Sequence, residues 1–96
     1  MNLVKHKLLR EKILERIKEL DYKQSFLVSD AEERGMRIAS DRLSRYLNGR
    51  SGGITEDQLI WLATRLGIFV NVNLGKLVIQ EGVAMFVIPK YDELES

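Results

Sequence analysis

Residues 31–50 read AEERGMRIASDRLSRYLNGR, and this stretch decides the fold. It begins inside a helical pattern that spans Tyr22 to Arg34. Gly35 is the expected stop of that helix, because glycine takes the left-handed conformation of a helix end without a steric penalty. Residues 36–39 are expected to form a short connector. The side chains expected to face inward from this helix are Phe26, Leu27 and Ala31.

The second half of the stretch predicts another helix, which begins near Ser40 or Asp41. Either side chain can accept a hydrogen bond from the first free backbone N–H groups of a helix. The helix is expected to end at Asn48-Gly49, a pair that readily takes left-handed backbone conformations. Its expected inward side chains are Leu43, Tyr46 and Leu47.

Further helices are expected on both sides of the stretch. Leu3 to Leu20 predicts an amphipathic helix, because its apolar residues recur at spacings of three and four. Residues 50–53 are expected to form a flexible loop. After the loop, Thr55-Glu56-Asp57-Gln58 has the pattern of a capping box, and the helix that it opens is expected to end at Gly67. Its expected buried face consists of Leu59, Leu62, Ala63 and Leu66.

Beyond Gly67 the apolar pattern changes from a helical period to alternation. Residues 68–73 and 76–80 flank Leu74-Gly75, which predicts a hairpin, and Val83 to Ile88 is a third β-rich run that ends at Pro89. The expected fold class is therefore mostly α with C-terminal β. It has a four- to five-helix bundle over residues 1–67, a two- or three-stranded antiparallel β region over residues 68–90, and an acidic tail at residues 91–96 that frays.

The composition excludes several classes of site. The chain has no cysteine and His6 is its single histidine, so disulfides, thiolate catalysis and histidine-rich metal sites are excluded. His6 is placed at a frayed helix start without a chemical role, and Asp30, Glu32 and Glu33 on a solvated helix face. No nucleophile elbow, P-loop or metal-ligand spacing is present, so we expect no enzyme, no cofactor and no metal.

Two global properties concern the surroundings of the protein. No apolar run approaches the ~18 residues that a membrane-spanning helix needs, and we expect a soluble cytoplasmic protein without membrane contact. Residues 1–50 carry 12 Lys and Arg against 8 Asp and Glu, whereas residues 51–96 carry 3 against 6. A basic first half fits a polyanionic partner, although an uneven solvated surface explains an imbalance of this size equally well.

The central stretch and the helix after it resemble the helix-turn-helix family of lambda repressor and Cro, also called the XRE family. The matching residues are Ala31-Glu32-Glu33-Arg34-Gly35, Ile38, Leu43-Ser44-Arg45-Tyr46-Leu47-Asn48-Gly49-Arg50, Ile54-Thr55-Glu56-Asp57-Gln58-Leu59 and Leu62-Ala63-Thr64-Arg65-Leu66-Gly67-Ile68. They cover about half of the chain. One departure is the spacing from Gly35 to Leu43, which exceeds the family pattern by two residues, with Met36 and Arg37 as the expected insertion.

The resemblance implies that the helix beginning near Ser40 lies in the major groove of duplex DNA. Arginine side chains there would read guanine through two hydrogen bonds, whereas serine would contact bases or phosphate. Asp41 is expected to cap the helix or to pair with Arg45 or Arg37. Lys23, Gln24, Asn48 and Arg50 are the expected phosphate contacts. The implied DNA-binding residues are Lys23, Gln24, Arg37, Ser40, Arg42, Ser44, Arg45, Asn48 and Arg50.

The favoured function is sequence-specific binding of double-stranded DNA by a transcriptional repressor of the phage or mobile-element type. It would act as a homodimer held together by the β region of residues 68–90, as in Cro-like repressors that this arrangement resembles. One alternative is an antitoxin-like module that binds a toxin protein as well as its own operator. Another is a phage DNA-packaging subunit. The strands could also fold back onto the helices of their own chain.

Overall fold

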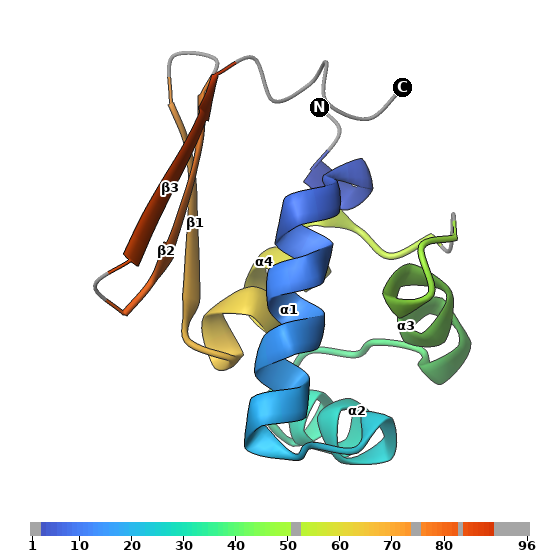
Figure 1. Cartoon of the computed structure of the whole chain (residues 1–96). Helices are drawn as coiled ribbons and strands as arrows, with labels where there is room; N and C mark the ends of the chain where they lie inside the picture. Colours follow the sequence, from blue (N-terminus) through green and yellow to red (C-terminus); the bar gives the residue numbers. More distant parts are fainter. Residues whose placement is uncertain (1–2, 51–52, 74–75, 83, 90–96) are drawn as a thin grey trace.

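Four α-helices precede a three-stranded antiparallel sheet in the computed structural model (Figure 1). The structure describes residues 3–50, 53–73, 76–82 and 84–89. The expected turn at Leu74-Gly75, part of the loop before Gly53, and the tail at residues 91–96 lie outside the described residues. The elements are η1 (Leu3–Lys5), α1 (Lys7–Leu20), α2 (Gln24–Glu33), α3 (Ser40–Leu47), α4 (Glu56–Arg65), β1 (Ile68–Asn73), β2 (Lys76–Glu81) and β3 (Ala84–Pro89).

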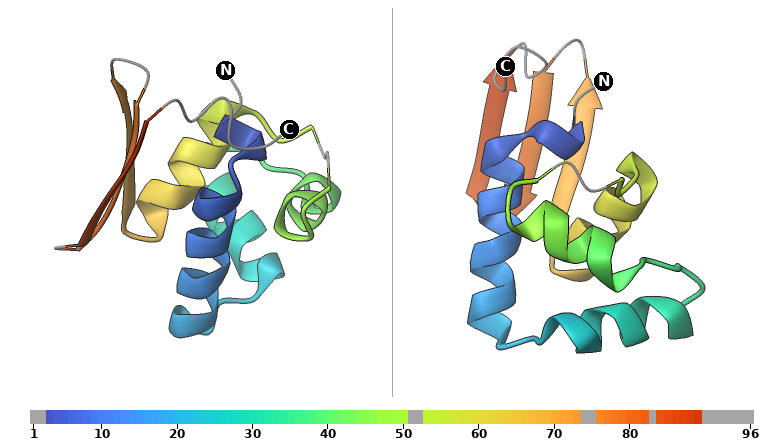
Figure 2. Two further views of the ribbon diagram at one scale, coloured as in Figure 1. Left: turned by 45° about the horizontal axis from the view of Figure 1, so that its top comes forward. Right: turned by 90° about the vertical axis from the view of Figure 1, so that its right-hand side faces the viewer.

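The elements are arranged in layers. The strands follow the order β1-β2-β3, and α4 packs against β1 on one face of the sheet. Figure 1 and Figure 2 show α1 and α4 between the sheet and α3, so that α3 lies on the far side of the molecule from the strands. Both α1 and α2 pack against α3. No helix among the described residues has the length and apolar character to cross a bilayer.

A single buried cluster joins the helices to the sheet. Ile68, Leu77 and Ile79 are each 0% exposed, and they belong to the same cluster as Leu43 of α3 and Leu62 of α4. In the strand register Ile79 lies opposite Val70 on β1 and Phe86 on β3, and both of these side chains pack against the core. The inner face of the sheet therefore completes the helical core. Folding back of the strands onto their own helices accounts for the inward position of these five apolar residues.

The chain starts differently from the expected helix over residues 3–20. A short 3₁₀ turn at Leu3–Lys5 comes first, and α1 begins only at Lys7. His6 between them is 2% exposed, and its Nδ1 accepts a hydrogen bond of 3.3 Å from the backbone N–H of Leu9. The expectation of a frayed histidine is wrong, because His6 is buried, caps α1 with its side chain and donates its backbone N–H to the carbonyl of Leu3.

The end of α2 follows the expected pattern. The N–H of Gly35 donates to the carbonyl of Glu32, and the N–H of Met36 donates to that of Ala31, as in a Schellman motif. Gly35 has φ of +87°, which only glycine adopts without strain. Ala31 is 0% exposed, as expected for a small residue at a helix crossing. Phe26 is 43% exposed beside the ring of Tyr22, so its predicted inward position is wrong.

The ends of α3 and the start of α4 are set by local signals. Ala39 is the N-cap of α3, and no side chain caps it, so the predicted capping by Ser40 or Asp41 is wrong. The helix ends as predicted at Asn48 and Gly49, where φ of Gly49 is +75°. The capping box at the start of α4 is confirmed, since the Thr55 hydroxyl accepts from the Gln58 N–H at 3.1 Å.

Candidate functional site

The predicted interface residues come from four neighbouring segments. Lys23 and Gln24 stand at the start of α2, Arg37 lies in the connector, and Arg50 follows α3. The remaining members, on α3 or at its C-cap, are Ser40, Arg42, Ser44, Arg45 and Asn48. All are exposed except Gln24 and Ser44, which are half-buried. Of the elements that carry these residues, α3 lies on the side of the molecule away from the sheet (Figure 2), and α2 packs against it.

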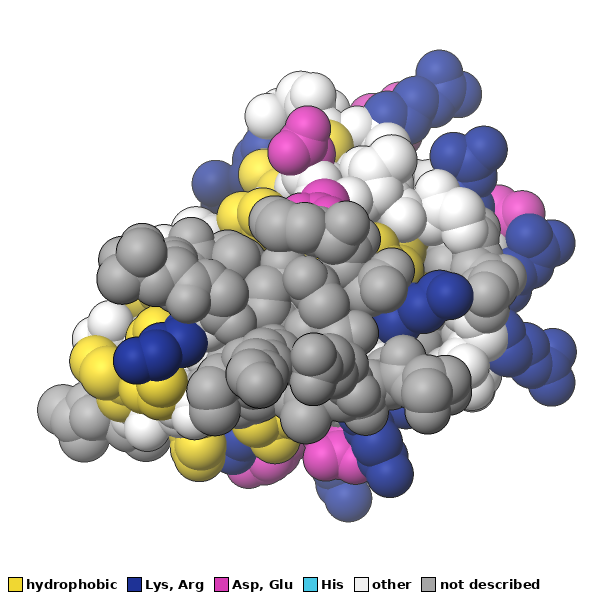
Figure 3. All heavy atoms as spheres, turned by 90° about the horizontal axis from the view of Figure 1, so that it is seen from above, with side chains coloured by type: hydrophobic (Ala, Val, Ile, Leu, Met, Phe, Trp, Pro, Cys, Tyr) yellow, Lys and Arg dark blue, Asp and Glu magenta, His cyan; other side chains and the backbone are white. Residues whose placement is uncertain are grey.

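The side of the molecule around α3 is rich in cations. In Figure 3 the Lys and Arg side chains project along the right-hand margin, which is the side of α3 in Figure 1, and hydrophobic side chains gather toward the sheet on the left. The opposite face of α3 is fixed in the core by Leu43, which is 0% exposed, and Tyr46, which is 2% exposed. A helix held in this way presents its outward side chains in a fixed orientation.

Two predicted phosphate contacts are engaged inside the protein. The Gln24 side-chain amide donates to the carbonyl of Ser40 at 2.9 Å and to its hydroxyl at 3.2 Å. The Asn48 amide donates to the carbonyl of Ser44 at 2.8 Å. Both amides therefore help to hold the two ends of α3. Arg45 lies 3.7 Å from Asp41, which matches the predicted pairing, and both side chains remain more than half exposed.

Two arginines approach the glycines around the end of α3. A Cβ atom at Gly49 would lie 3.4 Å from Cζ of Arg10, and one at Gly53 would lie 3.7 Å from Nε of Arg42. Arg10 comes from α1 and was not predicted as part of this surface. Sequence patterns offer no signal for it, because the contact depends on how α1 crosses α3.

The connector between α2 and α3 is held from α4. Ile38 is 3% exposed and anchors its middle. The Gln58 side-chain amide donates to the carbonyl of Arg37 at 3.0 Å, while its oxygen accepts from the Thr55 N–H at 3.0 Å. Gln58, which belongs to the capping box, therefore also contacts the segment that leads into α3. The capping box was predicted from the sequence, whereas this second contact of Gln58 was not.

A buried ion pair links α2 to α4. Asp30 is 8% exposed, and its carboxylate accepts from Nε of Arg65 at 2.7 Å and from Nε of Arg34 at 3.1 Å. The expected solvated position of Asp30 is therefore wrong. The hydrogen bond from Arg65 is the main reason why the pKa of Asp30 lies below its ordinary value of 3.8, with Arg34 acting in the same direction. The Arg65 guanidinium also lies 5.8 Å from the ring centroid of Tyr22.

Replacing Asp30 by Asn is expected to destabilise the protein at about pH 7, because both arginines lose their anionic partner. Since the folded pKa is depressed, the stabilisation is fully present above the ordinary carboxyl pKa and is lost as the pH falls through the folded value. The difference in melting temperature between Asp30→Asn and the parent should therefore become smaller as the pH falls below 3.8, the ordinary pKa of the carboxyl group. Thermal unfolding across acidic pH measures this, with Glu32→Gln as an exposed control on the same helix. An equal difference at every pH would contradict the ion-pair interpretation.

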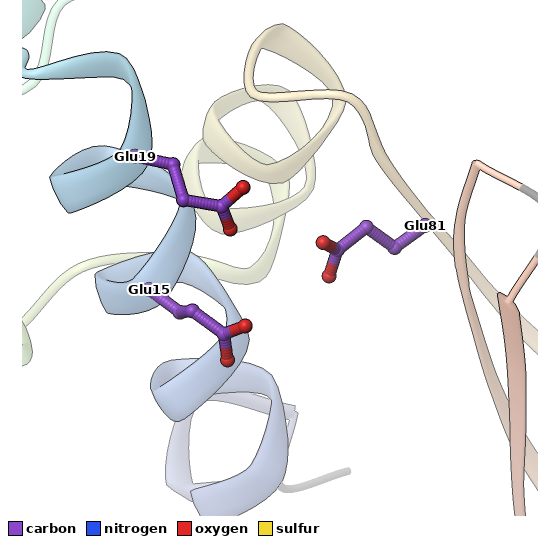
Figure 4. A group of neighbouring side chains, drawn as sticks. All are labelled: Glu15, Glu19 and Glu81. Atoms are coloured by element: carbon purple, nitrogen blue, oxygen red, sulfur yellow. The ribbon is translucent and has the colours of Figure 1, made fainter.

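An acidic cluster lies elsewhere, between α1 and the end of β2. Carboxylate oxygens of Glu15, Glu19 and Glu81 lie within 4.8 Å of one another, and Figure 4 shows the side chains converging. Lys12 is 3.8 Å from Glu15, and Arg16 is 3.5 Å from Glu19. These cations offset part of the repulsion among the carboxylates. We assign no metal to this cluster, because exposed acidic groups often gather without one.

The outer face of the sheet carries exposed apolar side chains. Phe69 is 56% exposed, Met85 is 60% exposed and Val87 is 52% exposed. Phe69 and Met85 both lie opposite Gln80 in the strand register, and Val87 lies opposite Val78. This surface faces away from the helices and therefore away from α3 (Figure 1).

Comparison of the chain with protein-family models, curated proteins and solved structures gives no match. The exposed side chains of α3 are Ser40, Asp41, Arg42 and Arg45, so two cations and one anion face outward.

Proposed function

We propose that this protein binds double-stranded DNA in a sequence-specific manner, as a helix-turn-helix transcriptional regulator of the repressor kind. One observation carries the proposal: α3 is fixed in the core through Leu43 and Tyr46, and its opposite face exposes Arg42 and Arg45. In this proposal α2 and α3 form the helix-turn-helix unit, and α3 enters the major groove.

The dimensions of α3 support this role. An α-helix with its side chains is about 10–12 Å in diameter. The major groove of B-DNA is about 12 Å wide and admits a single helix. Arg45 would read a base edge, whereas Arg50, just beyond the helix, would contact phosphate. Gln24 and Asn48 would act mainly through the internal hydrogen bonds that hold α3.

A dimer is part of the proposal, because a single short helix covers only a few base pairs. The open edges of the sheet are β1 and β3. Antiparallel pairing of an edge strand with its own copy places the two-fold axis perpendicular to the sheet. The helical layers of both copies then lie on the same face of the joined sheet, and both copies of α3 are exposed on the same side of the dimer. Packing the outer sheet faces together would instead turn the two copies of α3 to opposite sides, which does not suit one DNA duplex.

The exposed outer face of the sheet favours a second candidate function. Phe69, Met85 and Val87 form an apolar surface that edge pairing leaves uncovered. Such a surface is typical of contacts with another protein. An antitoxin-like module that binds DNA through α3 and a protein through the sheet is consistent with it.

Selection of bound sequences from a random duplex pool tests the proposed function. We expect enrichment of an inverted repeat whose half-sites lie about one helical turn apart, roughly 34 Å. Sedimentation of the same protein should give a dimer. A pool that shows no enrichment over unbound DNA would refute sequence-specific binding, and a ring-sized oligomer would favour the packaging alternative.

A further inference from the structure

The link between α2 and α3 does not by itself fix the orientation of α3. It runs from Arg34 to Ala39 and forms neither helix nor strand. A link without regular structure of its own restricts the relative position of its two helices only loosely. The N-cap of α3 supplies no help, because Ala39 has no side-chain hydrogen bond to offer. The orientation of α3 must therefore be fixed by contacts from other elements.

Gln58 of α4 supplies one such contact. Its Nε2 donates to the carbonyl of Arg37 at 3.0 Å, inside the link. Its Oε1 accepts from the backbone N–H of Thr55 at 3.0 Å. The orientation of the amide is unambiguous, since the Thr55 N–H can only donate and the Arg37 carbonyl can only accept.

The chemistry of the capping box makes this choice of residue informative. Glutamate and glutamine both complete a capping box, because the box needs only an acceptor at this position. Glutamate also suits the first turn of a helix, where the dipole favours negative charge. Only glutamine can complete the box and donate to Arg37 at the same time. The hydrogen bond from the Gln58 amide to the Arg37 carbonyl is therefore a contact that the cap alone does not require.

We propose that Gln58 is a positioning residue that tethers the link between α2 and α3 and thereby sets the orientation of α3. The proposal rests on the proposed function for its consequence in DNA recognition. Gln58 itself touches no DNA. Its amide transmits the position of the α4 N-terminus to Arg37, and Ile38 beside it is locked in the core.

The variant Gln58→Glu separates the two roles of this residue. The carboxylate still accepts from the Thr55 N–H, so α4 keeps its cap, but it faces the Arg37 carbonyl with a second acceptor and cannot donate. Thr55→Ala is the reciprocal variant, because it removes the hydroxyl of the box and leaves the bond from Gln58 to Arg37 in place. Asp57→Asn, added to Gln58→Glu, restores the net charge at the exposed neighbouring position.

Amide hydrogen exchange tests, in the absence of DNA, whether the bond from Gln58 to Arg37 stabilises the link. We expect Gln58→Glu to speed exchange at Met36 and Leu43, which flank the tethered segment, by roughly three- to tenfold, the factor that one net hydrogen bond supplies. Exchange at Leu59, whose N–H bonds to Thr55 in the first turn of α4, should stay unchanged. Thr55→Ala should speed exchange at Leu59 and leave exchange at Met36 and Leu43 unchanged. Unchanged exchange at Met36 and Leu43 in Gln58→Glu overturns the tether.

DNA titration then tests the positioning role. The ratio of affinities for the selected site and for random duplex should fall roughly three- to tenfold in the charge-restored double variant. Affinity for random duplex should match that of the parent, because Asp57→Asn and Gln58→Glu together leave the net charge unchanged. Faster exchange with an unchanged ratio overturns the positioning role. If the parent protein selects no DNA site, the proposed function fails. The exchange rates of Met36 and Leu43 in Gln58→Glu then still test whether Gln58 tethers the link.

Discussion

Ile79→Ala is expected to lower the free energy of unfolding by about 2–5 kcal/mol, the range for truncating a buried aliphatic side chain. Ile79 is 0% exposed on the central strand and lies between Val70 and Phe86 on the face that covers the helices. The cavity would open between the sheet and the helical layer. Because a domain of this size is stable by only about 5–15 kcal/mol, the loss is a large share of the total.

Urea unfolding followed by circular dichroism measures this effect, and a common slope against urea shows that the folded states are comparable. Val87→Ala is the matched control, since Val87 is 52% exposed on the opposite face of the same sheet. We expect that variant to change stability by no more than about 0.5 kcal/mol. Similar losses for both variants would mean that the sheet does not complete the helical core. Truncation after Gly67 is a poorer test of the strands, because it removes Ile79 together with the rest of the inner face.

Arg45→Ala is expected to reduce affinity for the selected DNA site by about 1–3 kcal/mol and to relax the preference at one base position, if Arg45 reads a base edge. Arg50→Ala should weaken binding to all sequences alike. It should also reduce the slope of log affinity against log salt by about 0.9, because one fewer phosphate is neutralised. The two arginines thus differ in the kind of loss as well as in its size.

Titrations at several salt concentrations with the selected site and with random duplex measure both effects. Arg45→Ala also leaves Asp41 without the partner that lies 3.7 Å away, so the double variant with Asp41→Ala separates the lost contact from new repulsion. Lys18→Ala removes an exposed cation from α1 and serves as the control. Equal losses for Arg45→Ala and Lys18→Ala on both kinds of DNA would place the binding surface elsewhere than α3.

The sequence predicted the elements well wherever the signal was local. The ends of α2 and α3 follow from Gly35 and Gly49, and the start of α4 follows from the Thr55 box. Alternation after Gly67 predicted strands close to the observed β1, β2 and β3. These signals need only neighbours within a few residues, because caps, glycine conformations and apolar periods act along the chain. The start of α1 was misplaced, since a histidine N-cap is an uncommon pattern.

The candidate site was predicted only in outline. The predicted residues of α3 and its flanks are exposed or half-buried in the structure, and α3 lies on the side away from the sheet. The internal roles of Gln24 and Asn48 were missed, since an exposed amide and one bonded to a backbone carbonyl look alike in a sequence. Arg10 was missed because nothing in α1 indicates that it crosses the end of α3.

By itself, the sequence determined a helical region followed by a C-terminal β region, because these depend on local periodicity and composition. Tertiary structure alone decided three other features. It buried Asp30 against Arg65, joined Gln58 to the carbonyl of Arg37, and divided the apolar strand residues into an inner face in the core and an outer face left exposed. The physical reason is common to all three: each depends on which surfaces of distant elements come together, and hydrogen bonds, ion pairs and burial act only at contact distance.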